Sequence, residues 1–409
     1  MKMIRNNSAV MADTTSDLWG QIMQKIKIGN VCDVLNGFAF KSENYVGSGI
    51  RVIRIANVQK GYIEDTTPAF YPLDSGGLDK YMLENGDLLM SLTGNVGRVA
   101  MLEADMLPAA LNQRVACLRL KSSKISKKYL FHILNSDYFE QQCIQSSKGV
   151  AQKNMSTEWL KDYEIPLYSP EQQNKIASVL DRVHLIINTQ KKQLQKLDEL
   201  VKARFVEMFG DPVTNLKGWT TKTLLDMGYC KNGMNFHNGD SGLKIHCLGV
   251  GDFKDLSVID GTEHLPVISL NEAPSEESML RDGDIVFVRS NGNKALVGRC
   301  LAVYPRNTPT TYSGFCIRYR LTSSEVDVTY LLQVLKTDSM RRKMAGRGAN
   351  IQNLNQQVLA ALDIPLPPIE QQQQFAAFVE QIDKSKVAVQ KSLDEAQLLF
   401  DSLMQQYFE

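Results

Sequence analysis

The chain has 409 residues, 43% of them hydrophobic and 22% charged, which predicts an ordinary globular protein of two or three domains. The formal net charge is only +1, which excludes a strongly basic nucleic-acid binder, so any DNA affinity must come from local patches or from a partner. No apolar run reaches the roughly 18 residues of a membrane span, and residues 1–26 hold no signal-peptide core, so we expect a cytoplasmic protein with no membrane partner.

An N-terminal extension, residues 1–26, precedes a region of mixed composition over residues 27–170. Short β-branched runs predict strands at 51–56, 87–92 and 115–120, and an apolar pattern predicts one helix at 127–146. Glycine, asparagine and serine separate these elements. We therefore expect an α+β module with a mostly antiparallel sheet.

A long amphipathic helix is predicted over residues 171–212. Pro170 and Glu171 suit its start, and Gly210 followed by Pro212 suits its end. Its apolar positions step by three and four residues, interrupted at Gln190 and Arg204. These seam positions are Ile176, Leu180, Val183, Ile187, Leu194, Leu197 and Val201.

The same order recurs in the second half of the chain. An α+β region over residues 213–369 has predicted strands at 284–288 and 315–319 and a predicted helix at 328–344, and a second long helix covers 370–409. The seam of this helix, interrupted at Lys386, comprises Phe375, Val379, Ile382, Val389, Leu393, Phe400 and Leu403. Heptads sustained for about five repeats predict that the helices pair as an antiparallel coiled coil. Packing of each helix on its own module is the alternative.

Short motifs show that the chain is a tandem duplication. Gly149, Ile165-Pro-Leu and Glu171-Gln-Gln recur 199 residues later at Gly348, Ile364-Pro-Leu and Glu370-Gln-Gln. Residues 83–91, which include Gly86-Asp87, recur as 280–288 with a Gly-Asp pair at the same place. Such a duplication predicts two similar modules about a pseudo-two-fold axis.

Candidate DNA-binding residues are side chains that carry paired donors or a positive charge and lie in predicted loops. For each of them the alternative is a solvated surface position or a turn hydrogen bond. In the first module they are Lys41, Arg98, Asn112, Gln113, Arg114, Lys148, Gln152, Lys153 and Asn154. In the second module they are Asn235, His237, Arg289, Asn291, Asn293, Lys294, Arg299, Arg341, Arg342, Lys343, Arg347, Asn350 and Gln352. The cluster 341–347 is the most basic and is the strongest candidate for phosphate contacts.

Motifs for catalysis are missing from the sequence. It has no GxxxxGK[ST] loop, no GxGxxG after a strand, no HExxH and no paired Cys-x-x-Cys among its seven cysteines. Asp211-Pro212-Val213 lacks the second proline and the aromatic residue of the amino-methyltransferase signature, so we interpret it as a helix stop. We therefore expect no catalytic residue, no metal site and no cofactor in this chain, and reduced thiols.

Two modules, each followed by a long helix and joined by the repeated Ile-Pro-Leu and Glu-Gln-Gln motifs, resemble the specificity subunit of type I restriction–modification enzymes. The resemblance covers about residues 20–409 and implies two target-recognition domains that each read half of a split double-stranded DNA site. It also implies two methyltransferase (modification) subunits and nuclease/translocase (restriction) subunits as partners, which would bind S-adenosylmethionine, ATP and Mg²⁺. The longer N-terminus is a departure from the minimal pattern.

Three other functions are compatible with parts of the sequence. A stand-alone DNA-binding regulator or anti-restriction decoy would bind DNA tightly alone, which the near-zero net charge disfavours. A coiled-coil protein adaptor would leave the basic cluster 341–347 unexplained. A fused restriction enzyme would need catalytic motifs.

Because the loops of the two modules differ in sequence, the split DNA site that the resemblance implies is expected to be asymmetric.

Overall fold

The computed structural model describes residues 24–147, 154–236, 241–253, 256–345 and 353–408. It divides into two compact units, which we call unit 1 (residues 1–190 and 392–409) and unit 2 (residues 191–391). Each unit holds one α+β module and a part of both long helices. Within the described residues, no helix is both long enough and apolar enough to cross a bilayer.

Unit 1 contains three small sheets. β1 pairs with β9, a four-stranded sheet has the order β2-β8-β5-β6, and a three-stranded sheet has the order β4-β3-β7. The strands are β1 (Gln24–Lys27), β2 (Cys32–Asn36), β3 (Ile50–Ile53), β4 (Phe70–Tyr71), β5 (Leu88–Ser91), β6 (Val99–Met101), β7 (Ala109–Leu111), β8 (Val115–Leu120) and β9 (Glu164–Leu167). Residues 24–26, which the sequence analysis placed in the N-terminal extension, belong to β1 and pair with β9.

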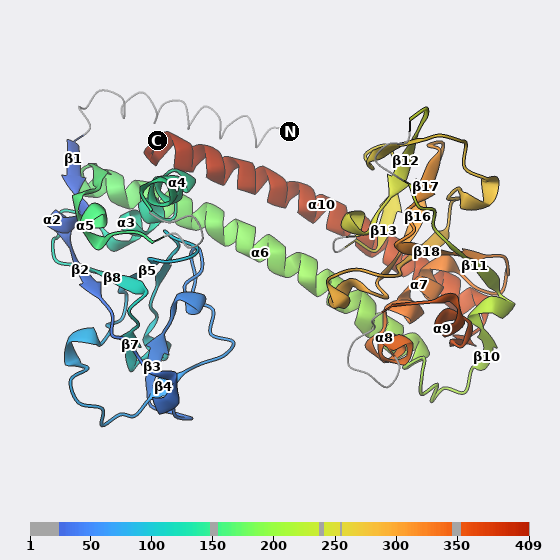
Figure 1. Ribbon diagram of the computed structural model, residues 1–409, viewed down its shortest axis with the longest axis horizontal. Coiled ribbons are helices and arrows are strands. Elements are labelled where there is room, and N and C mark those ends of the chain that lie inside the picture. Colours follow the sequence, from blue (N-terminus) through green and yellow to red (C-terminus); the bar gives the residue numbers. More distant parts are fainter. Residues whose placement is uncertain (1–23, 148–153, 237–240, 254–255, 346–352, 409) are drawn as a thin grey trace. The chain divides into compact units, whose positions relative to one another are not determined.

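The helices of unit 1 are α2 (Ile28–Val31), α3 (Lys127–Leu134), α4 (Asp137–Ser146) and α5 (Thr157–Asp162). α3, α4 and α5 lie between the long helices and the four-stranded sheet, and β3, β4 and β7 form the far end of the module (Figure 1). The prediction of one helix over 127–146 was wrong. Ser136 interrupts it, since its side chain accepts a hydrogen bond from the Phe139 N–H and caps a new helix.

Unit 2 repeats this order of strands. β10 pairs with β19, one sheet has the order β11-β18-β15-β16-β13, and another has the order β14-β12-β17. The strands are β10 (Thr220–Thr223), β11 (Gly228–Asn232), β12 (Leu243–Leu248), β13 (Val258–Asp260), β14 (Val267–Leu270), β15 (Asp284–Val288), β16 (Cys300–Tyr304), β17 (Thr310–Tyr312), β18 (Cys316–Leu321) and β19 (Asp363–Leu366). The two modules therefore share one topology, to which unit 2 adds β13.

The helices of unit 2 are α7 (Val328–Lys336), α8 (Asp338–Ala345) and α9 (Gln356–Ala360), with α7 packed on β16. The predicted helix 328–344 is also two helices. The break falls at Thr337, whose hydroxyl accepts a hydrogen bond from the Met340 N–H at 3.4 Å.

Most predicted strands are present with shifted ends. The segments 115–120 and 284–288 match β8 and β15, whereas 51–56 shortens to β3 because a 3₁₀ turn begins at Ile55. The prediction that 315–319 is a strand was wrong at its first residue, because Phe315 lies in a turn before β18. As expected, the described sheets are mostly antiparallel; the parallel pairs are β3–β7, β12–β17 and β13–β16.

The repeated Gly-Asp motif forms the same ion pair in both modules. Asp284 on β15 accepts two hydrogen bonds from Arg320 on β18, both of 2.8 Å. Asp87 accepts two from Arg119, of 3.0 and 2.6 Å. Both aspartates are buried, and a buried carboxylate needs such a partner. In both modules the aspartate of the motif thus links its own strand segment to the neighbouring strand.

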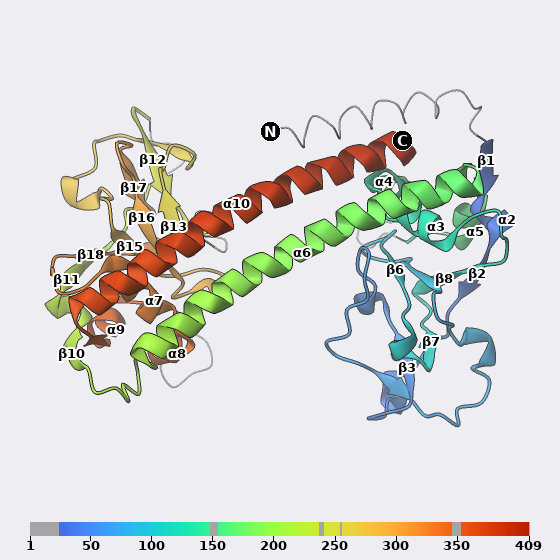
Figure 2. The ribbon, with the colours of Figure 1, turned by 180° about the vertical axis from the view of Figure 1, so that it is seen from behind.

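The long helices are α6 (Pro170–Phe209) and α10 (Ile369–Phe408). In each unit, a stretch of one lies beside a stretch of the other that runs in the opposite direction (Figures 1 and 2). All fourteen seam positions are buried or half-buried. The polar residues that interrupt the seams bond across the pair: Gln190 donates to the Ser392 hydroxyl at 2.6 Å, and Lys386 contacts Asp198 at 2.7 Å. Polar positions of this kind fix the register of a helix pair at some cost in stability.

The helices also pack on the modules, so pairing and packing on a module coexist. Phe205 and Phe209 of α6 lie in the core of unit 2, where the Phe209 ring is 4.8 Å from Tyr330. In unit 1, Phe408 of α10 lies 5.7 Å from Tyr129. The C-terminal end of each long helix thus packs on the module other than the one directly before it in sequence.

The Glu-Gln-Gln motif fixes the start of each long helix through its last glutamine. Gln173 is fully buried; it accepts from the Ser126 N–H and donates to the carbonyl oxygens of Lys124 and Tyr168. Gln372 makes the same three bonds in unit 2, to equivalent backbone groups. Both bonding capacities of each amide are used in a site closed to water.

Candidate nucleic-acid interface

Four loops of unit 1 meet in one hydrogen-bonded cluster, which we call loop junction 1 (residues 37–38, 92–93, 112–115 and 154–155). The Phe38 N–H donates to Leu111 O at 2.8 Å, and the Gln113 N–H donates to Phe38 O at 2.9 Å. A Cβ on Gly37 would lie 2.2 Å from the Asn112 carbonyl carbon, so the approach requires glycine.

The remaining loops of loop junction 1 are joined through the backbone of Leu92. Its N–H donates to Arg114 O at 3.0 Å, and its carbonyl accepts from the Met155 N–H at 2.9 Å. The Thr93 hydroxyl also bonds Asn154 at 2.9 Å. Loops that are distant in sequence therefore form one preorganised surface.

Unit 2 contains the equivalent cluster, loop junction 2 (residues 233–234, 289–290, 313–316 and 354). The Gly314 N–H donates to Met234 O at 2.8 Å, and the Arg289 N–H donates to Phe315 O at 2.8 Å. The Leu354 N–H donates to Arg289 O at 2.8 Å. A Cβ on Gly233 would lie 2.0 Å from Ser313 O, which matches the close approach at Gly37.

The two junctions share a backbone and differ in side chains. In each, the first residue of a turn accepts from the N–H two positions later: Asn112 from Arg114 at 3.4 Å, and the Ser313 hydroxyl from Phe315 at 3.3 Å. The turn of junction 1 carries exposed Gln113 and Arg114, whereas the turn of junction 2 carries Gly314 and exposed Phe315. Equivalent positions thus present different chemistry.

The structure brings several predicted residues of unit 1 to loop junction 1. Asn112, Gln113, Arg114 and Asn154 belong to it. Lys41, in the loop that follows Gly37, is exposed, with its ammonium 3.9 Å from Glu43. Arg98 is half-buried and donates to Gln59 Oε1, so part of its donor capacity serves the fold. Lys148, Gln152 and Lys153 lie outside the described residues.

In unit 2, Arg289 belongs to loop junction 2, and Asn235 lies beside it, next to Gly314. Asn291 and Asn293 shape the following loop instead: the Asn291 oxygen accepts from the Asn293 N–H at 2.7 Å, and the Asn293 oxygen caps the 3₁₀ turn η8 (Lys294–Leu296). Turn hydrogen bonds therefore account for the amide oxygens of both. Lys294 is exposed and Arg299 is half-buried. His237 lies outside the described residues.

The basic cluster of 341–347 is partly engaged within the protein. Lys343 on α8 forms an ion pair of 2.8 Å with Asp363, and Arg341 lies 3.5 Å from the carbonyl oxygens of Ala295 and Val297. Arg342 is exposed. The cluster supports the loop after β15 as well as offering positive charge. Arg347, Asn350 and Gln352 lie outside the described residues.

Phe315 is a surface residue that the sequence analysis missed, because it was assigned to a predicted strand together with the apolar residues that follow it. Its side chain is 61% exposed. The signal that could have identified the turn is Ser313-Gly314, a dipeptide that favours turns, directly before it.

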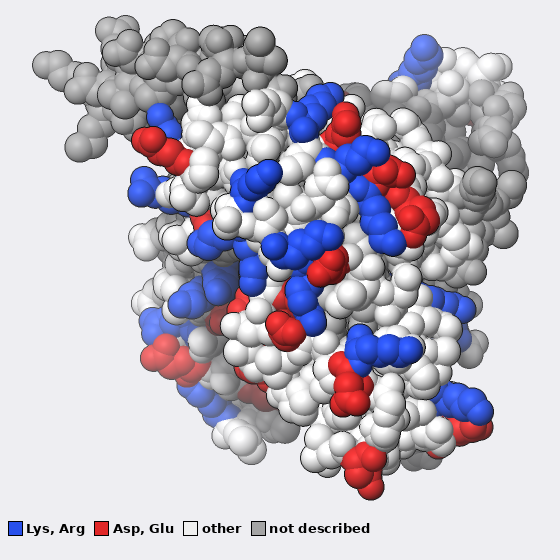
Figure 3. Space-filling model, turned by 90° about the vertical axis from the view of Figure 1, so that its left-hand side faces the viewer, with Lys and Arg blue, Asp and Glu red and all other residues white. Residues whose placement is uncertain are grey.

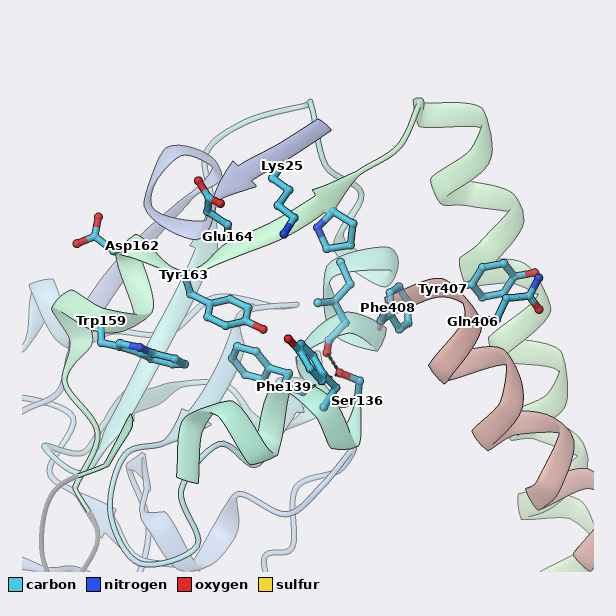
Figure 4. A pocket seen from close by; sticks show the side chains of 13 residues that line it. Lys25, Ser136, Phe139, Trp159, Asp162, Tyr163, Glu164, Gln406, Tyr407 and Phe408 are labelled. Atoms are coloured by element: carbon cyan, nitrogen blue, oxygen red, sulfur yellow. Dashed lines mark hydrogen bonds between the residues drawn. The ribbon is translucent and has the colours of Figure 1, made fainter. Parts of the chain in front are cut away.

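One face of unit 1 and one of its cavities show how charge and concavity are distributed there. On the face in Figure 3, lysine and arginine side chains are interspersed with aspartate and glutamate, so that face has no continuous basic surface. A cavity of about 470 Å³ opens where the end of α10 meets α3, α4 and α5 (Figure 4). Trp159, Tyr163 and Tyr407 line it, and none of the predicted DNA-binding residues does.

The thiols are unsuited to nucleophilic or metal chemistry. All seven cysteines are free and burial raises the pKa of each, to about 12 for Cys316 and about 11 for Cys300, which disfavours the thiolate. Within the described part of the chain, no three His, Cys, Asp or Glu side chains are grouped to hold a metal ion.

Comparison with known proteins agrees with this architecture. The family model of the type I restriction modification DNA specificity domain matches residues 22–199 and 263–396, more than half of the chain. The chain is 26% identical over 403 residues to the type I restriction enzyme StySPI specificity subunit of Salmonella potsdam, covering 92% of this chain and 86% of that protein. It is 24% identical over 421 residues to the EcoBI specificity subunit of Escherichia coli, covering 93% and 83%.

A solved structure shares the fold. The crystal structure of the type I restriction–modification S subunit from M. genitalium superposes with a TM-score of 0.56 at 15% identity, covering 96% of this chain and 97% of that chain. The duplicated α+β modules with their long helices, and the family match over both of its segments, show that the chain belongs to the family of type I restriction–modification specificity subunits.

Proposed function

We propose that this chain reads a bipartite, asymmetric double-stranded DNA site for a type I restriction–modification complex, with loop junction 1 on one half-site and loop junction 2 on the other. The supporting observation is the matched backbone of the two junctions with unlike side chains. Like scaffolds place reading groups in the same way, and unlike side chains select different base edges. Two weak readers on one chain can gain about 10² to 10⁴ in avidity.

In this proposal the long helices serve as the spacer between the half-sites. A helix of 40 residues is about 60 Å long. The buried glutamine at its start and the aromatic residues at its end attach it firmly to the modules. A rigid spacer would fix the gap between the two recognised sequences.

The helices also offer surface for the two methyltransferase subunits. Exposed apolar side chains on them include Leu185 (66%) and Leu398 (72%) in unit 1 and Val387 (70%) in unit 2. Ile186, Leu200, Val206 and Leu399 are exposed as well. Exposed apolar groups that recur along paired helices suit a protein interface. Nuclease/translocase subunits would join through the methyltransferase subunits.

Catalysis is assigned to the partners. The buried thiols and the lack of catalytic motifs in the sequence support a non-catalytic chain. S-adenosylmethionine, ATP and Mg²⁺ would act on the partner subunits. Methylation of a duplex base requires that the base be flipped out, so the modification subunits need a reader that holds the register.

Methylome sequencing of the host with and without the gene tests the proposal. We expect one bipartite adenine-methylation motif to be lost when the expressed gene is deleted. Replacing residues 213–369 by the module of another family member should change only one half of that motif. Unchanged methylation after deletion, or tight specific binding by the chain alone, would contradict the proposed role.

A further inference from the structure

The turn of loop junction 2 presents an aromatic ring on a rigid backbone. The Phe315 carbonyl accepts from the Arg289 N–H at 2.8 Å and the Ser290 N–H at 3.3 Å, and the Phe315 N–H donates to the Ser313 hydroxyl at 3.3 Å. The Cys316 N–H donates to Ser313 O at 2.8 Å. A single exposed apolar side chain is common on protein surfaces. Here, however, backbone hydrogen bonds join the turn that carries it to Met234, to Leu248 and to residues 289–290.

The neighbours of Phe315 carry fork-shaped polar groups. The position of a Cβ on Gly314 would be 2.1 Å from Asn235 Oδ1, so glycine makes room for the Asn235 amide beside the turn. The Arg289 guanidinium lies 3.5 Å from Gly314 O. An asparagine amide can pair with N6 and N7 of adenine, and an apolar side chain can contact the thymine C5 methyl, which lie on the same major-groove edge of an A·T pair.

Unit 1 provides the contrast. The equivalent turn position holds Arg114, a residue that suits O6 and N7 of guanine. The same backbone site therefore carries a hydrogen-bonding reader in one unit and an apolar reader in the other.

We propose that Phe315 is a specificity-determining residue that contacts the C5 methyl of a thymine in the half-site of unit 2, with Asn235 beside it. This inference rests on the proposed function. The contact would recognise thymine through its C5 methyl, a group that makes no hydrogen bond.

A deoxyuridine scan tests the contact, because deoxyuridine lacks only the C5 methyl. The full chain with its methyltransferase subunit is titrated with the duplex identified by the methylome, in which each thymine is replaced in turn. For the wild type, replacing thymine by deoxyuridine at one position in the half-site of unit 2 should weaken binding about threefold to fivefold, the effect expected for one buried methyl group. Phe315→Ala should weaken binding to the thymine duplex similarly and abolish the difference between thymine and deoxyuridine there. Phe315→Leu should retain that difference.

Arg114→Ala is the matched control, since it weakens the other half-site and should keep the wild-type response to deoxyuridine. Equal thymine preference in the wild type and Phe315→Ala at every position would overturn the inference while leaving the proposed function intact. So would failure of Phe315→Ala to assemble with the methyltransferase subunit, which would place the ring in a protein interface. A complex that recognises no specific duplex would overturn the proposed function itself.

Discussion

Replacing Gln173 by glutamate changes one NH₂ group to an oxygen at the buried start of α6. In the native protein, Gln173 accepts from the Ser126 N–H at 2.8 Å and donates to Lys124 O at 2.9 Å and Tyr168 O at 2.8 Å. A glutamate keeps the acceptor for Ser126 but, when ionised, has no donor for the two carbonyl oxygens. The shape of the side chain stays the same, so the substitution isolates the lost hydrogen bonds.

The expected cost follows from the burial of Gln173, whose side chain has no exposed surface. Each buried carbonyl left without a donor costs about 1–3 kcal/mol, so Gln173→Glu should lower the free energy of unfolding of unit 1 by about 2–6 kcal/mol. Gln172→Glu is the matched control. Its oxygen accepts from the Ser169 N–H at 3.2 Å, which a carboxylate can also do, and negative charge suits the first turn of a helix. We expect it to change stability by less than about 1 kcal/mol.

Native-state hydrogen exchange on the full chain measures, peptide by peptide, how strongly each variant protects its backbone amides. Gln173→Glu should lose protection in peptides covering 124–131 and 168–176, while peptides of unit 2 serve as an internal reference. Gln372→Glu should move the effect to unit 2, because it makes the equivalent bonds there. Equal protection in Gln173→Glu and Gln172→Glu would refute the structural role assigned to the last glutamine of the motif.

Three further perturbations give separate expectations. Asp284→Ala leaves the Arg320 charge buried and should destabilise unit 2 by about 3–5 kcal/mol in urea unfolding. Asp87→Ala should destabilise unit 1 by less, because the side chain of its partner Arg119 is 28% exposed to water. Equal effects of the two substitutions would contradict this reasoning. Burial lowers the pKa of His132 below 6.5, so its contribution to the free energy of unfolding is complete above that pH and is lost on acidification. The melting temperature should therefore fall less between about pH 7 and 5 in His132→Gln than in the wild type. An equal fall in both would exclude His132 as the source of this pH dependence. Phe209→Ala should cost about 3–5 kcal/mol, seen as lost exchange protection in unit 2 and not in unit 1.

Much of the fold could be predicted because burial of one face imposes a period on the sequence. The seams of α6 and α10 follow heptads for this reason, and the apolar runs that begin at the Gly-Asp pairs predicted the strands β5 and β15. The helix breaks at Ser136 and Thr337 could not be located, because apolar spacing continues through both and only the side-chain caps separate the helices. Local hydrogen bonds thus overrode the pattern.

The candidate site was harder to predict because it is assembled by tertiary contacts. Asn112 and Arg114 were predicted as DNA-binding residues because they are polar and lie beside a predicted strand, and the structure places both in the turn of loop junction 1. Phe315 was assigned to the strand that became β18 and was therefore not considered. Only the backbone bonds that join its turn to Met234 and Arg289 show that the two turns are equivalent. A single sequence holds no information on which distant loops make those bonds.

The anchoring of the long helices explains how the modules can diverge in their loops. Gln173 and Phe209 fix the two ends of α6, and Gln372 and Phe408 fix those of α10, by contacts with α3, α7 and the segments that precede them. These contacts involve none of the residues of the loop junctions. If the junctions read DNA as proposed, substitutions in them would alter the recognised bases without loosening the helices. The constraint that remains is steric, since Gly37 and Gly233 must stay small for the turns to approach.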